Sequence, residues 1–144
     1  MTAASPWLAI DANVYVAQFT EEKFSAHADN VFSLGVALMA PDFIGVEAAS
    51  AFLKKVRRGE MTLADATNAL DGLPRRVRLE PSAGLWSVAL RFAREHRLSA
   101  YDALYVSLAL REQCQLVTAD TAIADVLRVE SPGTLAWLGD FVGA

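Results

Sequence analysis

Four acidic residues have positions in the sequence from which their side chains could together form a metal site. Asp11 and Asp120 each end a short apolar segment that has the composition of a buried strand. Asp102 stands at the start of an expected helix, and Glu47 lies in another helix among apolar neighbours. Carboxylates held close together in a partly buried site repel one another, so they either share protons or bind a cation. The candidate chemistry is therefore that of a divalent ion held by oxygen ligands.

Each acid also has a purely structural interpretation. Asp11 and Asp120 precede helices, where an aspartate commonly accepts hydrogen bonds from free backbone N–H groups as an N-cap. Asp102 closes the segment Ser99-Ala-Tyr-Asp102, which has the form of a capping box. An ionised Glu47 among apolar residues is costly unless it is paired, so a buried salt bridge to an arginine is its structural alternative. Both sets of roles stay open at this point.

Short strands alternating with helices must position these acids. Hydrophobic periodicity, capping residues and the positions of Pro and Gly set the expected boundaries. We expect strands over residues 7–10, 77–79 and 115–118. We expect helices over residues 12–19, 24–39, 41–58, 62–74, 82–96, 103–110 and 121–127. The helix over 103–110 is nearly all apolar, which indicates that it is buried on most sides.

This alternation, in a chain too short for a barrel, indicates an α/β sandwich around a small, mostly parallel sheet. Ligands of such sheets bind beyond the carboxyl ends of the strands. A parallel sheet would place the strands before Asp11 and Asp120 side by side, with the helix that begins near Asp102 at the same edge. We therefore expect these three carboxylates to point into one cleft.

The types of the candidate ligands narrow the choice of metal. Oxygen ligands favour Mg²⁺ or Mn²⁺, whereas zinc sites commonly use histidine and cysteine. The two histidines, His27 and His96, have no ligand partner at helical spacing. Cys114, the single cysteine, is expected to fill apolar space.

Length and composition predict one domain over residues 1–144, since about 100 to 200 residues commonly share a core. The hydrophobic fraction of 53% is ample for such a core and excludes a disordered chain. A single cysteine excludes an intramolecular disulfide, and the first ten residues lack the basic region of a signal peptide. No apolar run reaches the roughly 18 residues that a membrane span needs. We therefore expect a cytoplasmic protein with no membrane association.

The net charge of −4 argues against a nucleic-acid partner only at first sight. The four candidate site acids account for this excess, and a bound cation would offset them. The basic residues gather in three groups. These are Lys54, Lys55, Arg57 and Arg58; Arg75, Arg76 and Arg78; and Arg91, Arg94 and Arg97. Each group is either a solvated helix face or a surface that contacts RNA.

Four segments resemble the PIN-domain nuclease family, and especially its VapC-type branch, the ribonuclease toxins of type II toxin–antitoxin pairs. They are Leu8-Ala-Ile-Asp11-Ala-Asn13, Pro41-Asp-Phe-Ile-Gly-Val-Glu47, Leu98-Ser-Ala-Tyr-Asp102-Ala-Leu-Tyr105 and Leu116-Val-Thr118-Ala-Asp120. The match runs in order through nearly the whole chain, and the third and fourth segments together are its most specific part. The resemblance implies a three-layer α/β/α fold.

The resemblance also implies roles for single residues. The four acids would gather around Mg²⁺ or Mn²⁺, with two supporting polar groups near the metal-bound waters. The ligands would be Asp11, Glu47, Asp102 and Asp120, and the supports Asn13 and Thr118. An RNA substrate, a homodimer and a cognate antitoxin that covers the site are implied as well. Thr121 departs from the pattern, because toxin-branch members often have a basic residue directly after the last acid.

The function that follows is hydrolysis of RNA phosphodiester bonds by a metal-dependent endoribonuclease, in which the metal lowers the pKa of a bound water. Two alternatives stay open. An aspartyl phosphatase would use Asp11 as its nucleophile, although such enzymes generally carry a second Asp where this chain has Asn13. A catalytically silent module that binds RNA or a protein partner would show no Mn²⁺-dependent thermal shift.

Overall fold

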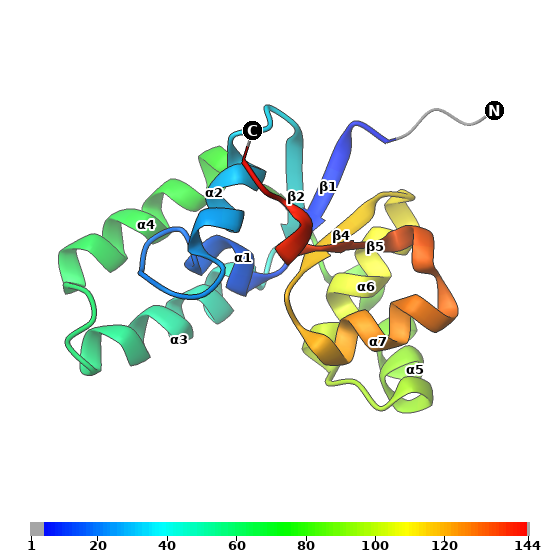
Figure 1. The fold of residues 1–144 in the computed structure, drawn as a ribbon. Coiled ribbons are helices and arrows are strands. Elements are labelled where there is room, and N and C mark those ends of the chain that lie inside the picture. The colour runs from blue at the N-terminus through cyan, green and yellow to red at the C-terminus, as the bar shows by residue number, and fades with distance from the viewer. Residues whose placement is uncertain (1–4, 144) are drawn as a thin grey trace.

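A parallel sheet forms the centre of the molecule, for which the computed structural model describes residues 5–143 (Figure 1). Its strands are β1 (Trp7–Ile10), β2 (Ala37–Pro41), β3 (Arg78–Glu80), β4 (Gln115–Thr118) and β5 (Leu135–Trp137). They follow the order β3-β2-β1-β4-β5, and each neighbouring pair is parallel. The predicted small parallel sheet is therefore confirmed.

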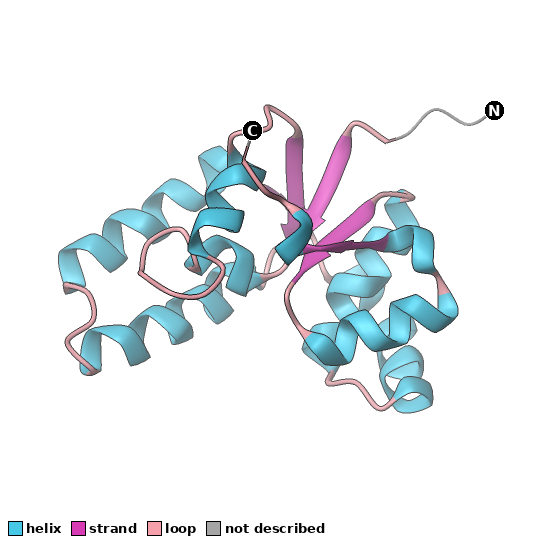
Figure 2. Ribbon diagram, viewed as in Figure 1, coloured by secondary structure: helices cyan, strands magenta, loops and turns pink. Residues whose placement is uncertain are grey.

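Helices lie on both sides of this sheet. They are α1 (Ala12–Val16), α2 (Ser25–Phe32), α3 (Ile44–Arg57), α4 (Leu63–Arg76), α5 (Trp86–His96), α6 (Ala100–Glu112) and α7 (Thr121–Glu130). Figure 2 shows the strands between α1 to α4 on one side of the view and α5 to α7 on the other. This arrangement confirms the expected α/β/α sandwich. None of the described helices is long and apolar enough to cross a membrane.

The central pair of strands fixes the edge at which the candidate acids meet. β1 lies beside β4, with Ile10 opposite Val117. Because the two strands run in the same direction, their carboxyl ends reach the same edge of the sheet. Asp11 follows β1 directly, and Asp120 comes two residues after the end of β4. The predicted side-by-side placement of these strands is confirmed.

Helix α6 forms much of the core on one face of the sheet, where it contacts β1, β2 and β4. Its residues from Ala103 to Ala109, apart from the half-buried Leu104, are less than 9% exposed. A helix that is apolar on nearly all sides must be buried on nearly all sides, as the sequence predicted. The burial also fixes the position of Asp102 in its first turn.

The prediction of one helix over residues 24–39 is wrong. Helix α2 ends at Phe32, the chain turns at Gly35 with a φ of 72°, and β2 begins at Ala37. β2 lies between β1 and β3, and its residues from Leu38 to Pro41 are buried. A strand buried on both faces reads as a continuous apolar run, which periodicity alone does not distinguish from a buried helix.

Smaller differences concern the ends of elements and one further strand. β5 was not predicted, because its three residues are only half-buried and carry no alternating pattern. α1 ends at Val16 rather than at residue 19, and α6 begins at Ala100 rather than at 103. α4 continues through Pro74 to Arg76, so the proline does not end the helix at the expected position.

Candidate active site

Asp11 is held by contacts from two elements. The residue is 4% exposed. Oδ1 accepts a hydrogen bond from the Val14 N–H at 3.1 Å, which makes Asp11 the N-cap of α1. Oδ2 accepts from the Thr118 hydroxyl at 2.5 Å, which joins the carboxylate to the end of β4. The cap expected from the sequence is present, and the same side chain also faces the other acids.

Thr118 connects two of the candidate acids. Its hydroxyl donates to Asp11 and accepts the Asp120 N–H at 3.0 Å. Asp120 in turn caps α7, since its Oδ1 accepts the Ile123 N–H at 3.0 Å. The side chain of Thr118 is fully buried, so this bridge is shielded from water. Thr118 therefore fixes the positions of Asp11 and Asp120 relative to each other.

Glu47 is held by a tyrosine rather than by the arginine that its structural alternative required. The Tyr105 hydroxyl donates to Glu47 Oε1 at 2.7 Å, and this bond joins α3 to α6. Tyr105 is 2% exposed and lies one helical turn after Asp102. The sequence places Tyr105 in an apolar helix and at the end of the third PIN-like segment, which assigned no role to its hydroxyl. The available signal was its hydroxyl, because a buried tyrosine hydroxyl usually has a hydrogen-bond partner.

Asp102 lies in the first turn of α6, where the Ser99 hydroxyl accepts its N–H at 3.0 Å. The predicted N-cap is thus present at Ser99. The side chain of Asp102 is half-buried and faces the same space as the other acids.

All four candidate acids line one cleft of about 570 Å³. Of the two expected supports, Asn13 lines this cleft with an exposed side chain, whereas Thr118 is buried beneath it. The other lining residues are Ala12, Val46, Ser50, Ala51, Lys54, Lys55, Arg58, Tyr101 and Tyr105. Asp125, a further acid on α7, lies outside the cleft and pairs with Arg128 at 3.2 Å. The structure thus brings together the acids that the sequence singled out.

Burial and the neighbouring acids destabilise the charged forms of Asp11 and Asp102. Burial raises the pKa of Asp11 to about 6, with further raising by Asp120 and Asp102 and opposing hydrogen bonds from Thr118 and Val14. Burial also raises the pKa of Asp102, and the charges of Asp120 and Glu47 act in the same direction while Ser99 opposes them. A cation in the cleft would relieve this repulsion.

The donor set fits Mg²⁺ or Mn²⁺ in kind, because it consists of carboxylate oxygens. Within residues 5–143, no group of three or more His, Cys, Asp or Glu side chains is arranged to hold an ion by itself. An ion in this cleft would therefore keep part of its water shell. That is the usual state of protein-bound Mg²⁺, which commonly uses one or two carboxylates and several waters.

Comparisons with known proteins show the family to which this chain belongs. Residues 8–128 match the PIN domain, so the chain belongs to the PIN domain family. It is 29% identical over 121 residues to Ribonuclease VapC3 of Pyrobaculum aerophilum, covering 82% of this chain and 92% of that protein. It is 34% identical over 99 residues to Ribonuclease VapC9 of Mycobacterium tuberculosis, covering 68% of this chain and 76% of that protein.

Solved structures show the same fold. The crystal structure of PAE2754 from Pyrobaculum aerophilum has a TM-score of 0.72 at 23% identity, covering 96% of this chain and 89% of that one. Mycobacterium tuberculosis VapC20, described as a Sarcin-Ricin loop cleaving toxin, has a TM-score of 0.67 at 16% identity, covering 83% of this chain and 94% of that one. At these identities the likeness concerns the fold alone.

Proposed function

We propose that this chain is a metal-dependent endoribonuclease that acts as the toxin of a toxin–antitoxin pair in the cytoplasm. The observation that supports this most is the convergence of four acids from distant segments in one cleft. Several relatives in the same family are named VapC ribonucleases. The cleft also carries lysines, an arginine and the exposed Tyr101, a combination suited to the phosphates and bases of single-stranded RNA.

Asp11, Asp102 and Asp120 would hold Mg²⁺ or Mn²⁺, directly or through water, with Asn13 among the polar groups at the rim of the cleft. The bound ion would lower the pKa of a coordinated water and screen the charge that develops on the phosphate. The contribution of Thr118 would be positional, because its hydroxyl fixes the carboxylate of Asp11 and the backbone of Asp120.

Glu47 would ligate the ion or orient the attacking water. Its Oε1 accepts the Tyr105 hydroxyl, which leaves Oε2 as the atom to accept a proton from that water. The water oxygen would then bond to phosphorus as the bond to the leaving nucleotide oxygen breaks. The proton would reside on Glu47 until it is released to solvent, and the departing nucleotide oxygen would take up a proton from solvent.

The phosphatase alternative is less well supported. Such enzymes generally carry a second Asp two residues after the nucleophile, and this chain has Asn13 at that position. A catalytically silent module of the same fold differs from the proposal only in its lack of cleavage, so experiment must separate the two.

The test compares two aspartates of α7 or its cap. Asp120→Asn should reduce Mn²⁺-dependent cleavage of total RNA by roughly 100-fold or more, because it removes a charge from the metal site. Asp125→Asn is the matched control, since Asp125 lies on the exposed face of the helix outside the cleft. Cleaved ends are mapped with Mn²⁺ and with EDTA. Cleavage that persists in EDTA, or an Asp120→Asn protein as active as the wild type, contradicts the proposal.

The proposed partners are an antitoxin and a second copy of the chain. Val46 and Leu53 on α3 are 75% and 44% exposed, and Val46 lines the cleft. Such residues could receive an apolar helix of an antitoxin that covers the site. Light scattering should give twice the chain mass of 15.6 kDa for the homodimer. A monomeric mass at working concentration contradicts that part of the proposal.

A further inference from the structure

The basic group at residues 54–58 lies on the same helix as Glu47. Side chains three or four residues apart share one face of a helix, and Glu47, Ser50, Lys54 and Arg58 follow this spacing. All four line the cleft. With a rise of 1.5 Å per residue, Lys54 lies about 10 Å and Arg58 about 16 Å along α3 from Glu47. One face of α3 therefore leads from an acid to two cations.

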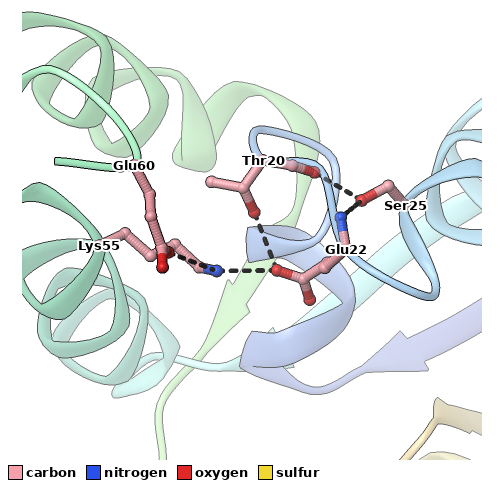
Figure 3. A network of polar contacts seen from close by, with 5 residues as sticks. All are labelled: Thr20, Glu22, Ser25, Lys55 and Glu60. Carbon is pink, nitrogen blue, oxygen red and sulfur yellow. Dashed lines mark hydrogen bonds and ion pairs between the residues drawn. The ribbon is translucent and has the colours of Figure 1, made fainter. Parts of the chain in front are cut away.

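Lys55 also lines the cleft, but its charge is already paired (Figure 3). Its Nζ lies 2.9 Å from Glu22 Oε2 and 3.9 Å from Glu60 Oε2. The Thr20 hydroxyl donates to the same Glu22 oxygen at 2.8 Å, and the Ser25 hydroxyl accepts the Glu22 N–H at 2.9 Å. These contacts, the Lys55 clasp, tie the loop after α1 to α3 and to the turn that follows it. The Lys55 side chain is only 18% exposed, which fits a structural role.

Lys54 and Arg58 differ from Lys55 in being exposed. In the part of the chain that the structure describes, neither forms an ion pair with an acidic side chain. Arg57 is exposed as well, but it is not among the residues that line the cleft. The two neighbours Arg57 and Arg58 thus carry the same charge on different faces of α3.

An RNA strand that enters a cleft with four carboxylates meets strong repulsion, which a metal ion offsets only at its own position. Basic side chains along the path of the RNA into the cleft would offset this repulsion at positions away from the metal ion. Phosphate contacts of this kind position a nucleic acid without reading its sequence.

We propose that Lys54 and Arg58 bind the phosphates of nucleotides that flank the cleaved bond, an inference that rests on the proposed ribonuclease function. Their distances along α3 from Glu47 place them beside the reacting phosphate rather than on it. Lys55 maintains the shape of this wall of the cleft, and Arg57 contributes only to the solvated face.

Binding of RNA by the metal-free protein tests this assignment. The probe is a fluorescein-labelled, unstructured single strand of roughly 12 nucleotides, followed by anisotropy in EDTA at several salt concentrations. Lys54→Ala and Arg58→Ala should each weaken binding roughly tenfold and lower the slope of log K against log salt by about 0.7. Arg57→Ala removes the same charge and should leave the slope unchanged. Thermal melts show whether each variant is folded.

A second measurement uses cleavage in Mn²⁺. Lys54→Ala and Arg58→Ala should raise KM while kcat stays within about twofold, because a phosphate contact outside the reacting group contributes equally to substrate and transition state. If Arg57→Ala weakens binding as much as Arg58→Ala, the effect is diffuse charge and the assignment is overturned. If the wild type cleaves RNA but Lys54 and Arg58 prove dispensable, this inference fails and the ribonuclease proposal stands. A wild-type protein that neither binds nor cleaves RNA overturns both.

Discussion

Replacing Asp11 by asparagine should stabilise the metal-free protein at neutral pH and not at acid pH. The two side chains have nearly the same shape, and an asparagine oxygen can still accept the Val14 N–H. The substitution removes the buried charge. It also deprives the Thr118 hydroxyl of its acceptor, because the amide nitrogen that faces it can only donate.

The magnitude follows from the pKa of Asp11. That pKa rises from 3.8 to about 6 on folding, which corresponds to about 3 kcal/mol of lost stability once the group is ionised in both states. The pKa of Asp11 is higher in the folded protein than in the unfolded chain. The loss of stability is therefore absent below the unfolded pKa of 3.8 and grows as pH rises from there to about 6. The orphaned Thr118 hydroxyl costs about 1 kcal/mol at every pH. Asp11→Asn should therefore be about 2 kcal/mol more stable than the wild type at about pH 7, and about 1 kcal/mol less stable below about pH 4.

Urea unfolding in EDTA across this pH interval measures the difference directly. Asp125→Asn is the control, since its carboxylate is exposed and its substitution should change the free energy of unfolding little at any pH. Addition of Mn²⁺ at about 100 times its Kd should then stabilise the wild type by about 2.7 kcal/mol and Asp11→Asn by much less. The difference in free energy of unfolding between Asp11→Asn and the wild type should depend on pH. A difference that does not change with pH would refute the reasoning that burial and the neighbouring acids raise the pKa of Asp11.

Three further predictions concern the contacts around the cleft. Tyr105→Phe should lower kcat about tenfold by freeing Glu47, and it should have no further effect in a Glu47→Gln background, as a double-mutant cycle of cleavage rates would show. Thr118→Val should lower the free energy of unfolding in urea by about 1 to 3 kcal/mol, because it leaves buried polar groups without a partner. Lys55→Met should lower the free energy of unfolding by roughly 0.5 to 1 kcal/mol, since the ion pairs of the clasp are partly exposed, and an unchanged melting temperature would contradict the clasp.

Much of the site could be predicted from the sequence because its acids mark abrupt changes of polarity. Asp11 and Asp120 each follow an apolar strand, and the structure places these two strands side by side inside the sheet. The rules for parallel sheets then bring both residues to one edge without any knowledge of side-chain contacts. Glu47 could be singled out for a related reason, because it is a charged residue among apolar neighbours in its helix.

The remaining features depend on three-dimensional contacts that no local pattern encodes. β2 was hidden because a fully buried strand and a buried helix present the same run of apolar residues. The role of the Tyr105 hydroxyl was not predictable, because Glu47, which accepts it, lies 58 positions away in the chain. Arg57 and Arg58 differ only in the direction they take from the helix axis, which the end of α3 and its packing decide.

Asp11 and Asp120 also begin the helices α1 and α7, so the atoms proposed for chemistry are the ones that start two elements of the fold. Removing the whole side chain at these positions should therefore have a different effect from removing only its charge. An alanine would fray a helix, whereas an asparagine keeps an oxygen for the backbone N–H. Among variants that lose cleavage but stay abundant in a cell, asparagine should therefore be over-represented at positions 11 and 120. Asparagine is also the substitution to choose for trapping the protein with intact RNA.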